Sequence, residues 1–148
     1  EVDKVKGFAM FLNLNQFKDI GFFDDNFFIY LEETDLCKRL KDERKKIYLN
    51  KGLLIEHSGG SSHNRSINFE MELSRNWHWM WSKFYFNKKH RGFFVSILLG
   101  FISLLGNFLK YIIYMITFNK KRNIYRMRMS GIINSLLGRQ SWYRPELN

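Results

Sequence analysis

Five acidic residues stand among aromatic side chains in one short stretch of this 148-residue chain. The stretch is GFFDDNFFIYLEETDLCKRL, and its acids are Asp24, Asp25, Glu32, Glu33 and Asp35. A carboxylate beside apolar groups loses hydration, which raises its proton affinity and suits it to general-base catalysis. The alternative is structural, because acids favour the first turn of a helix and aspartates solvate turns. Local chemistry alone leaves both interpretations open.

Helical and extended segments are expected to position these acids. Residues 33–46 predict an amphipathic helix, with Leu36 and Leu40 on one face, acids in the first turn and bases in the last. The apolar runs at 5–12 and 47–56 predict short strands, the second interrupted by a turn at Asn50-Lys51-Gly52.

Three ordered blocks resemble the second half of the catalytic domain of family 2 glycosyltransferases. The blocks are GFAMFL from Gly7, then IGFFDDNFFIYLEETDLCKRL, then IYLNKGLLIEHSGGSS, and the resemblance covers about residues 1–62. It is nearest to the rhamnosyltransferase-like branch that builds bacterial surface polysaccharides such as lipopolysaccharide. The resemblance implies an α/β fold of the GT-A type over residues 1–66, followed by an α-helical membrane-associated tail. It also implies inverting transfer of a sugar from a nucleotide-sugar donor.

The same resemblance assigns roles to the acids. The pair Glu32-Glu33 stands where the family places the base that deprotonates the acceptor hydroxyl. The family more often has Glu-Asp there, so Glu33 replaces the usual aspartate, and Asp35 is the second candidate for the base. Asp24 corresponds to an aspartate beside the acceptor, where it either contacts the acceptor or shapes the loop.

A donor-side role is implied for the loop after the third block. His57 matches a histidine that, in some relatives, helps to hold a divalent metal, Mn²⁺ or Mg²⁺, on the diphosphate. His63 and Arg65 are candidates for diphosphate binding, because the neighbouring glycines allow close approach and arginine forks onto phosphate. The nucleotide-binding half with its Asp-x-Asp motif is not among these residues, so we expect the chain alone not to transfer sugar.

Charge is divided unevenly along the chain. Residues 1–60 hold ten Lys/Arg and eleven Asp/Glu, whereas residues 61–148 hold fourteen and three. A basic, aromatic half suits a polyanion, either nucleic acid or an anionic membrane.

Residues 67–91 predict an amphipathic helix with an aromatic surface, in which Trp77 either packs or contacts the acceptor.

The strongest apolar signal lies at residues 92–118. Eighteen uncharged residues separate Arg91 from Lys110, enough for about 27 Å of helix against a hydrocarbon core of about 30 Å. A stripe of small and polar residues at 96, 100, 103 and 107 marks one side of an otherwise apolar helix. With bases at both ends, a helix or hairpin lying in the membrane interface is favoured over a span, and a buried core helix is the alternative.

The partners and the compartment follow from these features. The single cysteine, Cys37, favours a reducing compartment, and hence the cytoplasmic face of the inner membrane, with peripheral or monotopic attachment. A lipid-linked saccharide is the expected acceptor, and residues 119–148 are a basic tail without chemistry. A non-catalytic membrane-surface or assembly module is the alternative. Single-strand nucleic-acid binding is the weaker one, because the tryptophans run into a lipid-like segment, so no nucleic-acid partner is expected.

Overall fold

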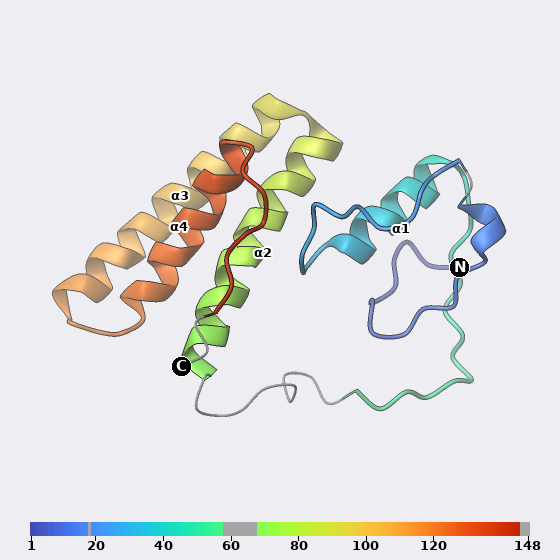
Figure 1. Cartoon of the computed structure of the whole chain (residues 1–148), viewed down its shortest axis with the longest axis horizontal. Helices are drawn as coiled ribbons and strands as arrows, with labels where there is room; N and C mark the ends of the chain where they lie inside the picture. Colours follow the sequence, from blue (N-terminus) through green and yellow to red (C-terminus); the bar gives the residue numbers. More distant parts are fainter. Residues whose placement is uncertain (18, 58–67, 146–148) are drawn as a thin grey trace. The chain divides into compact units, whose positions relative to one another are not determined.

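The computed structural model describes residues 1–17, 19–57 and 68–145, and the chain divides into two compact units. The first unit covers residues 1–62 and the second covers residues 63–148. Figure 1 shows α1 in the first unit and the three longer helices α2, α3 and α4 in the second.

The α/β prediction is wrong, because the described residues contain four α-helices and a 3₁₀ turn and no strand. The segments expected as strands, 5–12 and 47–56, are outside any regular element. A strand exists only where its backbone pairs repeatedly with a neighbour. The N-terminal segment and the segment after α1 are joined by a backbone hydrogen bond from Val2 N to Ile47 O (2.9 Å), and no ladder of such bonds forms in the described part.

The first unit is built around α1, which spans Glu32–Asp42. Leu36 and Leu40 lie on one face of α1 and pack with Phe17 in a small core, as the sequence pattern predicts. Met10, Leu12, Ile20 and Ile47 surround that core. The 3₁₀ turn Leu14–Gln16 is capped by Asn13 and is followed at Gly21 by a positive φ of 72°, the conformation expected of a residue that closes a turn.

The second unit is a bundle of three helices. Helix α2 spans Asn68–Arg91, α3 spans Phe93–Ile116 and α4 spans Arg122–Leu136, and every pair of them packs together. Successive helices run in opposite directions (Figure 1). Met80, Phe84 and Ile132 form the shared core, and Gly138, with φ of 70°, follows the end of α4.

Two glycines let the helices approach closely. A Cβ added at Gly131 would lie 2.3 Å from the Trp77 carbonyl oxygen, so α4 rests directly on the backbone of α2. A Cβ at Gly100 would lie 2.8 Å from the Phe84 ring, which packs against α3. The cavity left between the helices is about 10 Å³, room for no more than a single water.

Helix α2 does not present the aromatic surface predicted for it. Trp77, Trp81 and Phe84 are buried against α4 and the C-terminal segment, and Trp79 is the exposed tryptophan of this helix. The indole N–H of Trp77 donates to Ser130 Oγ (3.1 Å), and that of Trp81 donates to Arg139 O (3.0 Å). Aromatic rings at helical spacing serve here as the core, because α4 and the chain after it cover them.

The C-terminal segment runs back along α2 (Figure 1) and is held there by His78. The His78 Nε2 lies 2.8 Å from the Tyr143 carbonyl oxygen, and its Nδ1 lies 2.8 Å from Ser141 Oγ. Since a carbonyl only accepts, Nε2 donates, and the neutral ring accepts at Nδ1 from the serine hydroxyl. Burial, with a smaller contribution from Arg144, lowers the pKa of His78 to about 4, although the hydrogen bond to Tyr143 opposes the shift.

This histidine predicts acid lability of the helical unit. Between its folded pKa of about 4 and its unfolded pKa of 6.5, the unfolded chain binds the extra proton, so stability falls as pH falls through that window. The loss approaches about 3 kcal/mol at the acid end. Urea unfolding in detergent micelles, followed by tryptophan fluorescence, should show this slope for the wild type and for His90→Gln, and should lose it in His78→Gln. An unchanged slope in His78→Gln would contradict the assignment.

Candidate acceptor-side site

The acidic pair occupies the first turn of α1. Glu32 and Glu33 follow Tyr30 and Leu31, whose φ angles of 68° and 69° are in the left-handed region that non-glycine residues rarely adopt. The first helical hydrogen bond runs from Asp35 N to Leu31 O (2.8 Å). Strained backbone directly before a helix that begins with two carboxylates is common at functional sites, where surrounding contacts hold it in place.

Glu32 differs from its neighbour in its surroundings. Its Oε2 atom is buried and has no hydrogen-bond partner in the described part of the chain. Burial raises the pKa of Glu32, the adjacent Glu33 charge raises it further, and a backbone hydrogen bond partly offsets the rise. A carboxylate with raised proton affinity next to a second carboxylate is an arrangement suited to proton transfer.

The raised pKa predicts that Glu32 destabilises the fold above its unfolded pKa. The folded state holds the proton to higher pH than the unfolded chain, so stability falls as pH rises through the raised pKa. Glu32→Gln should therefore raise the thermal midpoint of the chain at pH 7, and the gain should vanish below the ordinary value of 4.5. A glutamine variant that is less stable than the wild type at pH 7 would show that the charged form is favoured in the fold.

Asp35 is locked into a structural contact. It is fully buried, and its Oδ2 accepts from Arg39 Nε at 2.9 Å. The same guanidinium donates from Nη1 to Ile20 O (2.7 Å) and Gly21 O (3.1 Å), and from Nη2 to Phe22 O. Arg39 thereby ties the preceding loop to α1. Sequence reasoning gave Arg39 no role, although the four-residue spacing from Asp35 on one helix was a signal for the pair.

The three sequence blocks meet at residues 7 and 8. A methyl group at Gly7 would lie 3.5 Å from Glu33 Cβ, so the first block passes over the acidic pair. The Phe8 ring stacks on the His57 ring, with centroids 4.7 Å apart and planes 4° from parallel. The first block thus contacts the second through Gly7 and Glu33, and the third through Phe8 and His57.

Asp24 shapes the turn that precedes the acidic pair. Its Oδ1 accepts from the backbone N–H of Asn26 (3.0 Å) and from the Asn26 side-chain amide (2.7 Å). The Phe27 N–H donates to the Asp24 carbonyl oxygen at 3.0 Å, which closes the turn. Of the two roles expected for Asp24, these contacts account for the loop-shaping one.

The donor-side residues are only partly within the described structure. His63 and Arg65 lie outside the described residues. His57 is exposed, and among the described residues no group of three or more His, Cys, Asp and Glu side chains is gathered that could hold a metal. Mn²⁺ and Mg²⁺ take several oxygen ligands, so His57 alone does not make a metal site, and its role as one ligand stays a prediction.

Trp77 is not accessible to an acceptor sugar. Its indole is fully buried within the helical unit, where it contacts Trp142 and Tyr143, so no face of the ring is open to a sugar.

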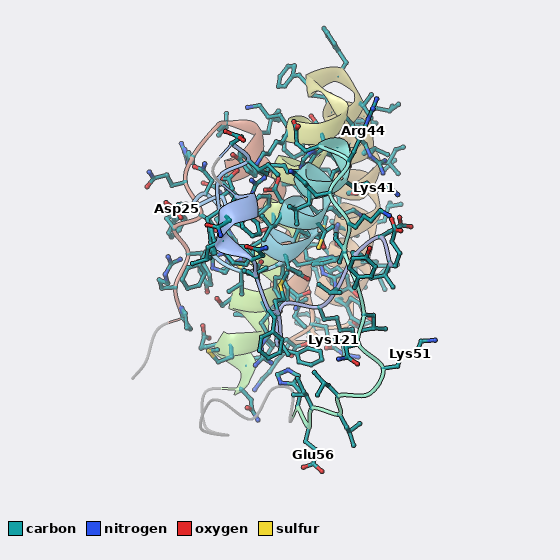
Figure 2. The ribbon with its side chains drawn as sticks, turned by 90° about the vertical axis from the view of Figure 1, so that its right-hand side faces the viewer. Asp25, Lys41, Arg44, Lys51, Glu56 and Lys121 are labelled. Carbon is teal, nitrogen blue, oxygen red and sulfur yellow. The ribbon has the colours of Figure 1, made fainter. Side chains whose placement is uncertain are left out.

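The first unit has a groove of about 980 Å³ beside α1, lined mainly by apolar side chains of residues 4–13 and 45–55. Neither Glu32 nor Glu33 lines that groove. Figure 2 shows Lys51 and Glu56 projecting outward from the segment after α1.

Helix α3 is long and apolar enough to cross a membrane, judged by length and composition. Its buried residues are Ser96, Gly100 and Asn107, which belong to the small and polar stripe and face the other two helices. The opposite side is exposed and apolar, and we call it the α3 apolar face; its members include Phe94, Leu98, Phe101, Ile102, Leu109 and Ile116. An exposed apolar face of this extent marks an interaction surface.

Comparison with known proteins supplies no relative. No protein-family model matches the chain, and neither the curated proteins nor the solved structures give a match.

Proposed function

We propose that this chain is the acceptor-side part of an inverting glycosyltransferase that transfers a sugar from a nucleotide sugar to a lipid-linked saccharide at a membrane surface. The observation that supports this most is the contact of the first block with both of the others, through Gly7 with Glu33 and through Phe8 with His57. The proposal concerns the reaction and these residues, and it requires no sheet.

Glu33 is the proposed base. Its carboxylate takes the proton of the acceptor hydroxyl as the hydroxyl oxygen attacks the anomeric carbon, and the nucleoside diphosphate leaves from the opposite face with inversion. The raised pKa of Glu32 supports a proton-handling role for the pair. Asp35 is a weaker candidate, because its buried ion pair with Arg39 already uses its charge.

The neighbours of α3 favour a helix that lies along the membrane. Helix α4 packs against α3 and carries Arg126 and Arg128 in its middle, so a crossing α3 would draw both charges into hydrocarbon. Insertion scales put that at about 2.5–3.5 kcal/mol for each arginine. With 15 residues, or about 22 Å, α4 is also too short to cross.

Membrane attachment is therefore monotopic in this proposal. The α3 apolar face enters the boundary between headgroups and acyl chains, and the bases at both ends of α3 contact anionic headgroups. With a single buried cysteine, the side of attachment is the cytoplasmic face of the inner membrane.

The function is tested with the full-length protein produced from its gene. Purified in detergent with lipid extract from its host, it should release nucleoside diphosphate from one member of a panel of nucleotide sugars and place labelled sugar in the lipid fraction. If the protein is folded and bound to lipid but turns over none of these donors, the proposal is overturned.

That negative result would favour a non-catalytic membrane-surface module. The exposed α3 apolar face is the observation behind this second candidate, because it needs only the helical unit. The two candidates separate cleanly, since both predict lipid binding and only the transferase consumes a nucleotide sugar.

A further inference from the structure

Two cations share one aromatic ring where α3 meets α4. Lys110 Nζ lies 5.7 Å from the centre of the Tyr125 ring, and Arg128 Cζ lies 5.5 Å from the same centre. The Tyr114 ring stacks on the Tyr125 ring, with centroids 5.3 Å apart and planes 6° from parallel. We call these four residues the Lys110–Arg128 cluster. Lys110 is the single charged residue of α3.

Arg128 is held in place with most of its donors unused. Its Nε donates to Asn76 Oδ1 at 2.7 Å, and the Asn76 amide is itself fixed by a hydrogen bond to Glu72 O at 2.8 Å. No hydrogen bond from Nη1 or Nη2 of Arg128 is made to another described residue. A guanidinium fixed at one nitrogen, with the terminal nitrogens available, is preorganised to bind the oxygens of an anion.

No carboxylate in the described part of the helical unit pairs with this cluster. The sequence has no Asp or Glu between Glu72 and Glu146, whereas thirteen Lys and Arg lie in that interval. Neither Lys110 nor Arg128 forms an ion pair with another described residue. Aromatic rings attract cations without cancelling their charge. The two like charges therefore repel each other until an anion joins them.

The surroundings indicate what carries that anion. Lys110 is exposed and belongs to the same helix as the α3 apolar face, so a ligand that reaches it from the membrane brings both an anionic group and acyl chains. Lysine side chains near apolar surface extend toward the headgroup layer. An anionic phospholipid meets both requirements, because its phosphate lies directly above its acyl chains.

We propose that Lys110 and Arg128, which both contact the Tyr125 ring, bind the phosphate of an anionic phospholipid. The proposal rests on the membrane-surface part of the proposed function and adds a specific headgroup site to it. Attachment then includes specific recognition of a phosphate by the fixed guanidinium group of Arg128. This adds to the general attraction between basic residues and an anionic leaflet.

The test keeps charge constant. Arg128→Lys retains the positive charge and removes the fork, and Arg126→Lys makes the same change at an exposed position of the same helix. Binding of the whole chain to vesicles of phosphatidylcholine with phosphatidylglycerol is measured by sedimentation, after circular dichroism shows that each variant keeps its helices. We expect Arg128→Lys to weaken binding about tenfold and Arg126→Lys to leave it unchanged.

A second pair of variants tests the same site if Arg128→Lys fails to fold. Lys110→Gln and Lys120→Gln each remove one exposed charge, so a purely electrostatic surface would lose about the same affinity in both, roughly fivefold. The site predicts a distinctly larger loss for Lys110→Gln.

The outcomes separate the inference from the function. Equal behaviour of each variant and its control, with wild-type binding intact, overturns the site and leaves membrane attachment standing. No binding of the wild type overturns both. Binding to neutral vesicles doped with polyprenyl phosphate, but not to phosphatidylglycerol vesicles, overturns the phospholipid as source and moves the site to the acceptor lipid.

Discussion

Replacing Glu33 by glutamine is expected to lower sugar transfer by about 10²–10⁴-fold, the usual contribution of a positioned general base. Glutamine has nearly the same shape as glutamate and cannot take a proton. No hydrogen bond or ion pair of the Glu33 side chain forms with another described residue, so stability should not change. The measurement is the transfer rate of the full-length protein with saturating nucleotide sugar, alongside its thermal midpoint.

Two further variants make the Glu33 result specific. Glu43→Gln removes a carboxylate just past the other end of α1 and should leave transfer unchanged. Glu33→Asp supplies the aspartate that the proposed transferase more often has at this position and should keep part of the activity. Full activity in Glu33→Gln would move the base to Glu32 or Asp35 or remove it from α1 altogether.

Replacing Gly131 by leucine is expected to separate α4 from α2. The added Cβ would lie 2.3 Å from Trp77 O and 3.2 Å from Trp81 N. Both are backbone atoms of α2, and they cannot move away without shifting the helix. Overpacking that forces the backbone to move typically costs about 1–3 kcal/mol. The urea midpoint of the whole chain in detergent micelles measures the loss.

Gly106→Leu is the matched control for this change. It adds the same side chain to α3 at a position where nothing lies within 4 Å of the new Cβ. Because leucine favours helix over glycine by roughly 0.8 kcal/mol, this variant should be as stable as the wild type or more so. If Gly131→Leu unfolded at the same urea concentration as Gly106→Leu, the close α2–α4 contact would be contradicted.

Helices could be predicted from the sequence because their signals are local. The acids and bases at 33–46 and the apolar face of Leu36 and Leu40 correctly predicted α1. Its end was placed four residues too late, since Arg44 adopts a φ of 56° that no spacing rule indicates. The stripe at Ser96, Gly100 and Asn107 was visible as a pattern, but the sequence did not identify α2 and α4 as its neighbours.

The strand predictions were wrong because strand formation depends on long-range pairing and not on local signals. The runs at 5–12 and 47–56 have strand-like composition, yet pairing depends on a second strand in the right register, which composition does not specify. Burial of Trp77 likewise depends on α4 and on the segment of Tyr143. The meeting of Gly7 with Glu33 also depends on long-range contacts, and only the order of the three blocks pointed to it.

The measurement that tests the account most directly compares two acceptors. The full-length protein is given a labelled nucleotide sugar with either the lipid-linked saccharide extracted from its host or the same saccharide released from its lipid. The account predicts labelled product from the lipid-linked acceptor on anionic vesicles and little from the soluble one, with both lost in Glu33→Gln. Equal transfer to the soluble saccharide, or transfer that survives Glu33→Gln, would contradict a membrane-surface transferase with its base on α1.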